Sequence, residues 1–525
     1  MAYMKKEVIS ADEAARLIKS SDAVIIGGSG GIGVAESILE ALESRYLSSQ
    51  EPKQLTLIHT TGIGAVTHHG LNRLAHEGLI KRVIGGNFGL QLPFMKELIV
   101  GNRIEAYNFP QGVMCQLYRA MAAKQPGLIS HVGLGTYIDP RVEGGKMNEV
   151  TTEELIELVE LAGNEMLFFH APQADVAILR GTTADEHGNI SLEHEAATLE
   201  GLSIAQAVYN AGGVVICQVK RTVERGKLNP HMVRIPGFLI DKLVIDANQP
   251  QNYAVQFDPS LCGETRRPLE SISPDPLDER RIIARRAALE LFPGAVVNMG
   301  VGVSAGIPNV TAEENLDGIF TITIEAGVIG GVAGHGLYFG SAYNPEVIID
   351  QAYMFDFYDG GGLDVAFVSF AEIDINGNVN VTRFGNRNDG AGGFIDITQN
   401  ARSIVFSGTL TGGGLEVSIE QGALRIKKEG KIQKFVSQVN QISFSGQRAL
   451  ERGIDVLFVT ERAVFRMTQA GIEISEVAPG IDIEQDIAPH IPFPVKIAQT
   501  VKTMDSRLFC EGQMGIRDDI LSRAR

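Results

Sequence analysis

The sequence predicts an α/β protein made of two related, open, mainly parallel α/β domains that face a shared cleft. The first observation is length, because 525 residues exceed what one hydrophobic core ordinarily holds. The second is composition: hydrophobic residues make up 44% and glycines are frequent without any period, which is typical of compact α/β chains and not of disordered ones. The third is an order of strands, glycine turns and helices that recurs in both halves of the chain.

A proline-rich segment near the middle of the chain marks the predicted domain boundary. Residues 266–278 contain three prolines together with several charged residues. Because proline interrupts helices and the pairing of strands, we interpret this segment as a linker. The linker separates an N-terminal domain, residues 1–265, from a C-terminal domain, residues 279–525.

The two halves share one order of elements: a helix, an apolar strand, a glycine-rich turn and a second strand. We place these at residues 11–21, 23–26, 27–33 and 55–61 in the first half, and at 279–292, 295–298, 299–308 and 320–326 in the second. Further on, Asp175–Ile190 parallels Asp364–Val379 at an offset of 189 residues. Strands that alternate with helices form parallel sheets with helices on both faces, and such sheets bind ligands beyond the carboxyl ends of their strands.

Charge and targeting signals restrict the class of function. A net charge of −17 disfavours nucleic acid and anionic membranes as partners, since both require a basic surface. No apolar run approaches the ~20 residues of a membrane span, and no apolar region of a signal peptide follows the charged N-terminus. We therefore predict a soluble, cytoplasmic protein.

Cysteine and histidine usage predicts neither a metal site nor a thiol nucleophile. The four cysteines are scattered without a CxxC pair, which predicts reduced thiols, and the eleven histidines form no HExxH motif. A serine hydrolase is poorly supported as well.

Two glycine-rich turns are candidates for anion binding. Gly28–Gly33 matches GxGxxG between a strand and a helix, which is the pattern of dinucleotide-binding turns. The acidic residue that this function requires at the end of the second strand is missing, because Thr60 and Thr61 stand there. A purely structural tight turn is the alternative. The second-half turn, with Gly300 and Gly302, precedes a predicted helix and is the better candidate for a phosphate group.

Glu325 is the predicted nucleophile. It ends an apolar, β-branched strand, where an unpaired carboxylate is costly, and glycines follow it. A loop-capping role is the alternative, but the matching position in the first half is Thr60, so the fold does not require an acid there. A carboxylate can attack a thioester and form a covalent intermediate. The glycines allow close approach of a substrate and leave N–H groups for an oxyanion.

The whole chain resembles the family I coenzyme A transferases in the single-chain form that fuses an α-like and a β-like half. Within that family it is most similar to the acetate or propionate CoA-transferases. The resemblance rests on five segments in the right order: Asn108–Val113, Asn298–Pro308, Thr323–Gly327, Gly360–Asp364 and Gly390–Asp396.

The resemblance implies a ping-pong transfer of CoA from a short-chain acyl-CoA to acetate, propionate, butyrate or acetoacetate. Glu325 would attack the acyl-CoA, and the CoA thiolate would then form a glutamyl-CoA thioester on the same side chain. Coenzyme A is a substrate here, so no resident cofactor is implied. Relatives commonly form dimers or tetramers, which implies a homo-oligomer.

The resemblance also implies roles for other residues. Gln111 would donate to the substrate or to an oxyanion. The remaining candidates for contact with substrate or CoA are Gly300, Gly302, Asn380, Gly392 and Gly393.

Two alternatives to a transferase stay open. An acyl-CoA hydrolase on the same fold would let water intercept the glutamyl thioester. A non-catalytic sensor would bind small effectors without forming a covalent intermediate, and it would leave the one-sided Glu325 unexplained.

Overall fold

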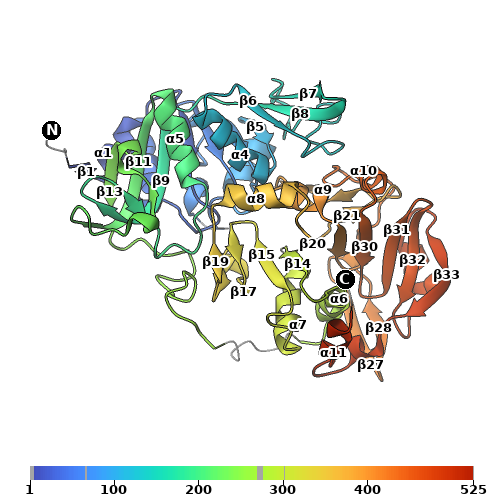
Figure 1. Ribbon diagram of the computed structural model, residues 1–525. Coiled ribbons are helices and arrows are strands. Elements are labelled where there is room, and N and C mark those ends of the chain that lie inside the picture. The colour runs from blue at the N-terminus through green and yellow to red at the C-terminus, as the bar shows by residue number, and fades with distance from the viewer. Residues whose placement is uncertain (1–4, 66–67, 269–275, 301, 524–525) are drawn as a thin grey trace. The chain divides into compact units, whose positions relative to one another are not determined.

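The computed structural model has the predicted α/β architecture, with mainly parallel sheets and helices (Figure 1). It describes residues 5–65, 68–268, 276–300 and 302–523. The chain divides into two compact units. The first comprises Met1–Arg267, Ile324–Asp356 and Gly385–Asp396, and the second comprises Pro268–Thr323, Phe357–Phe384 and Ile397–Arg525.

Two segments from the second half of the chain pack with the first unit. Residues 324–356 and 385–396 belong to it, although the boundary placed by the proline-rich segment assigns them to the C-terminal domain. The predicted bounds of 1–265 and 279–525 follow the order of the chain, whereas contacts group the residues differently. Within the predicted linker, residues 269–275 lie outside the described residues.

The first unit is built on one large sheet. Its strands, in spatial order, are β1 (Glu7–Ile9), β13 (Lys242–Ile245), β11 (Val214–Val223), β9 (Val176–Asp185), β2 (Ala23–Ile26), β3 (Leu55–His59), β4 (Ile80–Gly85) and β5 (Glu105–Asn108). Every neighbouring pair among these is parallel. β2 and β9 are buried along their whole length, as expected for apolar strands that are covered on both faces.

Antiparallel pairs extend this unit. β10 (Ile190–Ser191) pairs antiparallel with β9 and with β12 (Val233–Ile235). A separate antiparallel sheet has the order β6 (Gly127–Ser130), β8 (Asn164–His170), β7 (Ile156–Leu161).

The helices of the first unit cover both faces of its sheet. Those within residues 1–267 are α1 (Ala11–Leu17), α2 (Glu36–Ser49), α3 (Leu92–Phe94), α4 (Gln111–Ala122) and α5 (Gly201–Ala211). α1 packs on α2, and α4 packs on α5. The crossovers β2–α2–β3 and β9–α5–β11 run in opposite directions across the sheet, so their right-handedness places α2 and α5 on opposite faces. Ser10 and Glu13 form a capping box at the start of α1, and Gly212 ends α5 in the left-handed region.

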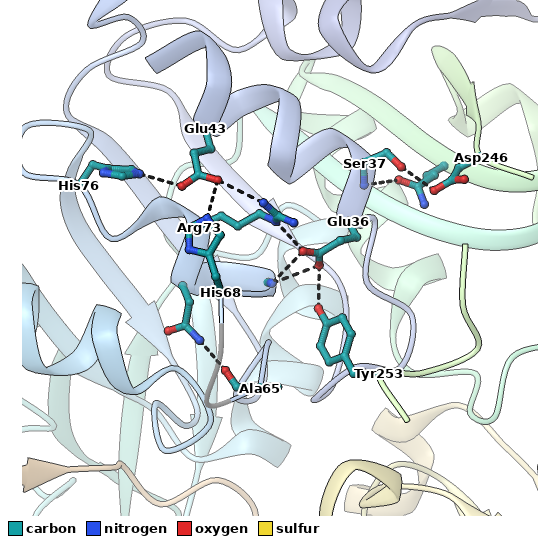
Figure 2. Close-up of polar contacts among 12 residues, drawn as sticks. Glu36, Ser37, Glu43, Ala65, His68, Arg73, His76, Asp246 and Tyr253 are labelled. Carbon is teal, nitrogen blue, oxygen red and sulfur yellow. Dashed lines mark hydrogen bonds and ion pairs between the residues drawn. The ribbon is translucent and has the colours of Figure 1, made fainter. Parts of the chain in front are cut away.

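A polar network ties α2 to the segment between β3 and β4 (Figure 2). The Glu43 carboxylate accepts hydrogen bonds from His68 Nε2 (3.0 Å), His76 Nε2 (3.0 Å) and Arg73 (3.2 Å). Arg73 also donates to Glu36, about two helical turns earlier in α2 (2.6 Å). Burial opposes the charge of Glu43, but the hydrogen bonds from His76 and His68 outweigh it and lower the pKa of its carboxyl. The acidic face of α2 therefore fixes the loop that leads into β4.

The second unit contains a second parallel sheet with an antiparallel extension. From β15 onward the spatial order is β15 (Thr321–Ile324), β14 (Val296–Met299), β20 (Val365–Ser369), β25 (Ser403–Ser407), β30 (Asp455–Val459), β31 (Ala463–Thr468), β32 (Gly471–Val477) and β33 (Lys496–Thr503). The strands from β15 to β30 are parallel. β31 is antiparallel to both of its neighbours, and β33 is parallel to β32.

Helices and short strands complete the second half of the chain. The helices are α6 (Glu279–Ala288), α7 (Ile307–Glu313), α8 (Gln351–Asp359), α9 (Phe394–Asn400), α10 (Gly446–Glu451) and α11 (Arg517–Leu521). The short strands are β16 (Val328–Ile329), β17 (Val332–Ala333), β18 (Ala342–Tyr343), β19 (Val347–Ile348), β21 (Glu372–Ile373), β22 (Val379–Asn380), β23 (Arg383–Phe384), β24 (Arg387–Asn388), β26 (Thr411–Gly412), β27 (Glu416–Glu420), β28 (Ala423–Lys428) and β29 (Ile432–Gln433). Among the described residues, no helix is long and apolar enough to cross a membrane.

The internal repeat is visible in side-chain contacts. Asp175, just before β9, accepts a hydrogen bond from Ala23 N–H (2.8 Å) and donates its own N–H to Ala23 O (2.9 Å). Asp364, just before β20, makes the same two bonds with Val296 at the start of β14 (2.9 Å each). In each half, one aspartate thus joins the starts of two neighbouring parallel strands.

A second duplicated contact lies in the turn after β9 and in the turn after β21. Asp185 accepts hydrogen bonds from His187 N–H (2.9 Å) and Asn189 N–H (3.0 Å). Asp374 accepts the equivalent bonds from Asn376 N–H (2.9 Å) and Asn378 N–H (3.1 Å), again 189 residues later in the chain. Short polar side chains that bond to the backbone a few residues ahead stabilise turns of this kind.

Because the duplicated turns bond alike, we expect Asp185→Ala and Asp374→Ala to lower the free energy of unfolding by similar amounts, about 1–3 kcal/mol each. The chain contains no tryptophan, so urea unfolding followed by circular dichroism is the suitable measurement. Asp317→Ala serves as the control, since Asp317 is exposed. A loss in either turn variant that does not exceed that of the control would contradict the expectation.

Candidate active site

Glu325 lies in a tight turn between β15 and β16. Gly327 N–H donates to Ile324 O (2.9 Å), which closes the turn around Glu325. Gly327 has a φ of +94°, and a Cβ at this position would lie 2.2 Å from Ile349 O. Only glycine fits there without displacing the backbone. The sequence Glu-Ala-Gly therefore determines the turn on which the Glu325 carboxylate lies.

The first unit brings Glu325 together with three of the residues that the sequence singled out. A Cβ on Gly393 would lie 2.4 Å from Glu325 Oε2, so this glycine packs directly against the carboxyl group. Gln111, the fully buried first residue of α4, lies close enough to hydrogen-bond with it. Gln111 N–H in turn donates to Gly392 O (2.9 Å). The ring of Phe355 closes the same region, 3.2 Å from the Cβ position of Gly393.

The backbone N–H groups of Gly392 and Gly393 differ in whether they are hydrogen-bonded within the protein. Gly392 N–H donates to Gly86 O (2.7 Å), and the φ of Gly392 is +56°, so this residue makes the turn. Gly393 N–H donates to no other residue in the described part of the chain. Of the two backbone N–H groups, the one at Gly393 is therefore available to a substrate oxygen beside Glu325.

Desolvation dominates the electrostatics of Glu325. Its side chain is only partly accessible, and burial raises the pKa of its carboxyl to about 7. The Gln111 amide partly offsets this effect, although neither of its side-chain polar atoms has a hydrogen-bond partner of full geometry among the described residues. A buried amide without such a partner is costly, and it is well placed to donate to an added oxygen.

A second buried carboxyl, Glu200, was missed by the sequence reasoning. It is fully buried at the start of α5 and accepts a hydrogen bond from Thr60 Oγ1 (2.7 Å). Burial, together with the charge of Asp350, raises its pKa to about 7. No local motif marks Glu200, because its partner Thr60 lies 140 residues earlier in the chain.

The turn that contains Gly300 and Gly302 belongs to the second unit. Gly302 has a φ of +89°, and a Cβ there would lie 2.6 Å from Ser369 Oγ. That hydroxyl accepts hydrogen bonds from Val303 N–H (3.0 Å) and Ser304 N–H (3.3 Å). Two N–H groups of this turn are thus already bonded within the unit, and residue 301 lies outside the described residues. Contact of Gly300 and Gly302 with CoA stays a prediction.

Asn380 also belongs to the second unit and is fully buried. Its amide donates to Glu372 Oε2 (2.7 Å) and to Arg383 O (2.6 Å), and its oxygen accepts from Thr382 N–H (2.9 Å). These bonds hold the turn between β22 and β23. These hydrogen bonds support a structural role for Asn380. Its contact with substrate stays a prediction.

The first glycine turn, Gly28–Gly33, is closed by bonds within its own unit. Gly30 N–H donates to Gly62 O (2.7 Å), and Ser29 and Ile32 bond to each other through both backbone groups. A Cβ on Gly31 would lie 2.6 Å from the ring of Tyr253. This geometry favours a tight structural turn over a dinucleotide site. In the described part of the chain, no three His, Cys, Asp or Glu side chains are grouped to hold a metal ion.

Comparisons with known proteins agree on one family. The model of the coenzyme A transferase family matches residues 8–246. The chain is 44% identical to acetate CoA-transferase YdiF of Escherichia coli K12 over 97% of its own length and 96% of that protein. It is 42% identical to caffeate CoA-transferase of Acetobacterium woodii over 98% and 99%. A crystal structure of acyl-CoA transferase YdiF from E. coli O157:H7, described as a thioester complex with CoA, matches with a TM-score of 0.92 and 43% identity over 97% of both chains.

Replacement of Glu325 by glutamine tests the desolvation of this carboxyl. Folding raises the pKa of Glu325 from its ordinary 4.5 to about 7. The free energy of unfolding is therefore highest below pH 4.5, where Glu325 is protonated in both states, and it decreases as the pH rises through 7. Glutamine does not ionise. Relative to wild type, Glu325→Gln should gain up to about 3 kcal/mol between pH 4.5 and pH 8. Urea unfolding of both proteins at pH 5 and pH 8 measures the change, and an equal difference at the two pH values would contradict it.

Proposed function

The chain belongs to the coenzyme A transferase family, and we propose that it moves CoA from a short-chain acyl-CoA to a carboxylic acid through a glutamyl-CoA thioester on Glu325. The observation that carries this proposal is the setting of Glu325 in the first unit. Its carboxyl lies against Gly393 and beside the amide of Gln111, and burial largely desolvates it. The description of the YdiF structure as a thioester complex with CoA supports the same intermediate.

The first half-reaction needs an ionised carboxylate. Glu325 attacks the acyl carbonyl, the bond between carbonyl carbon and sulfur breaks, and CoA leaves as a thiolate with the electron pair. The product on the protein is an acyl-glutamyl anhydride. Negative charge on the former carbonyl oxygen is stabilised by donors that are already in place, for which Gln111 Nε2–H and Gly393 N–H are the candidates.

The thiolate then attacks the glutamyl carbonyl of the anhydride. The first carboxylic acid leaves as its carboxylate, and Glu325 carries CoA as a thioester. An acceptor carboxylate reverses these steps and departs as the new acyl-CoA. No proton has to be transferred, because every nucleophile and every leaving group is an anion. This accords with a site that offers hydrogen-bond donors beside the carboxyl.

The partial burial of Glu325 supports transfer over hydrolysis. A carboxylate that is less hydrated is a better nucleophile, and a site from which water is largely excluded protects the anhydride and the thioester. Hydrolysis is the competing function, and it differs in one measurable respect. A transferase turns over only when an acceptor carboxylate is present, whereas a hydrolase releases CoA without one.

We propose acetate, propionate, butyrate and acetoacetate as the acids exchanged. The likeness to caffeate CoA-transferase adds a bulkier aromatic acid that must be compared with them. Values of kcat/KM for these acids against one acyl-CoA donor would rank them. A cytoplasmic homo-oligomer that acts without a resident cofactor remains our prediction, and light scattering would measure its size.

Intact-protein mass spectrometry tests the covalent intermediate. After acetyl-CoA is added without an acceptor acid, we expect wild type to gain the mass of one CoA minus water, and Glu325→Ala to gain nothing. Rapid turnover of wild type without any adduct would contradict the covalent mechanism. An adduct that persists in Glu325→Ala would contradict the choice of nucleophile.

Gly393→Ala tests the close packing at the carboxyl group. The added Cβ would meet Glu325 Oε2 at 2.4 Å, so the carboxyl must move. A displacement of about 1 Å is expected to lower kcat/KM on the order of 100-fold while thermal unfolding changes little. Gly412→Ala is the control, because a Cβ there makes only ordinary contacts, at 3.8 Å and beyond. Similar activity of the two variants would contradict the assignment of Gly393.

A further inference from the structure

We propose that Asn108 is a positioning residue that holds the segment Gly390–Gly393 against Glu325. Asn108 is the last residue of β5, three residues before Gln111, and its side chain is fully buried. Among the described residues, no hydrogen bond joins its side chain to the carboxyl of Glu325. Its hydrogen bonds connect three separate parts of the first unit. This inference rests on the proposed function, since it assigns Asn108 an effect on the formation of the glutamyl-CoA thioester.

The side-chain amide of Asn108 makes four hydrogen bonds. Its Nδ2 donates to Gly85 O (2.7 Å) and to Gly86 O (2.6 Å) at the end of β4. Its Oδ1 accepts from Ala391 N–H (3.0 Å) and from the hydroxyl of Tyr137. A primary amide has two donor hydrogens and one acceptor oxygen with two lone pairs, so every bonding position of the group is used.

The orientation of this amide is fixed by its partners. Gly85 O and Gly86 O can only accept, and Ala391 N–H can only donate. A flipped amide would place oxygen against two carbonyl oxygens and NH₂ against an N–H, which would lose all three bonds. The group is therefore held in one orientation in a place where unsatisfied polar atoms are costly.

These bonds lead directly to the residues around the carboxyl. Ala391 is followed by Gly392, whose N–H donates to the same Gly86 O that Asn108 holds, and whose carbonyl accepts Gln111 N–H. The turn before Gly393 is thus bonded on one side to Asn108 and on the other to the first residue of α4. A Cβ at Gly390 would lie 2.5 Å from Asn108 Nδ2, so the segment also packs tightly on the amide.

From this geometry Asn108 acts through the backbone and not on the substrate. If its amide is removed, Ala391 N–H and the Tyr137 hydroxyl lose their acceptor, and Gly85 O and Gly86 O each lose one of two donors. The turn that carries Gly393 N–H is then free to shift. A shift of about 1 Å is sufficient to lower the rate of a positioned reaction on the order of 100-fold. Because Asn108 is fully buried and its side chain is hydrogen-bonded to residues of the first unit, the KM for acyl-CoA should change far less than kcat.

The decisive experiment compares Asn108→Ala with a matched variant, Asn148→Ala. Asn148 has nearly the same bonding pattern: its Nδ2 donates to Ile99 O (2.8 Å) and Ile104 O (2.9 Å), and its Oδ1 accepts from Thr151 Oγ1 (2.5 Å). It makes no hydrogen bond to the Gly390–Gly393 segment in the described part of the chain. Both variants lose a structural amide of the first unit, so any difference in catalysis reports on the place of Asn108.

We expect Asn108→Ala to lower the single-turnover rate of adduct formation, and kcat, on the order of 100-fold, with KM for acetyl-CoA within about threefold of wild type. Asn148→Ala should keep kcat within about threefold of wild type. Asn108→Asp is a second test variant. It preserves the shape of the side chain and the two hydrogen bonds that Oδ1 accepts, and it loses the two hydrogen bonds that Nδ2 donates. Its kcat should fall by about tenfold or more, and it decides the question if Asn108→Ala does not fold.

Two failures are distinguishable in this design. Wild type that turns over without forming a CoA adduct would refute the proposed function. Wild type that forms the adduct, together with Asn108 variants whose rates lie within about threefold of Asn148→Ala, would overturn the role of Asn108 alone. A KM that rises in proportion to the fall in kcat/KM would overturn it as well, because it would indicate a loss of substrate binding.

Discussion

The contact between the Glu325 carboxyl and Gly393 is the constraint on which the rest of this site depends. Burial removes solvent from this carboxyl, which is the proposed nucleophile. The pKa of Glu325 is therefore raised, and folding is less favourable at neutral pH. A fold keeps such a group only if its surroundings are rigid, and here the backbone supplies that rigidity. Gly327 and Gly392 take up left-handed conformations. The turn that faces the carboxyl is held by Gln111 N–H, which donates to Gly392 O, and by Asn108 Oδ1, which accepts from Ala391 N–H.

Duplication explains why one scaffold can hold an acid at the end of a strand in only one of its two copies. The aspartates that join neighbouring strands, Asp175 and Asp364, bond alike in both halves and preserve the framework. Where the second half has Glu325, the first half has Thr60, whose hydroxyl bonds to Glu200 from the start of α5. The framework is therefore common to both halves, while the side chains at the ends of the strands differ.

Much of this architecture could be predicted from the sequence, because the signals are local. The strand Ala23–Ile26 was placed at its observed bounds, and Glu325 stood out as an acid at the end of an apolar strand. Functions that depend on distant partners could not be predicted. Asn380 is hydrogen-bonded to Glu372 and Arg383, and the hydroxyl of Ser369 is hydrogen-bonded to the turn at Gly302. No spacing of residues along the chain indicates these contacts.

Localisation of the covalent intermediate tests the central claim most directly. Wild-type protein is mixed with acetyl-CoA in the absence of an acceptor, quenched in acid, digested, and fragmented in a mass spectrometer until the added mass is assigned to one residue. The account predicts the CoA mass on Glu325 and its disappearance when acetate is added before the quench in excess over acetyl-CoA. A CoA adduct assigned to any other residue, or an acetyl group in stable linkage to another side chain during turnover, would contradict it.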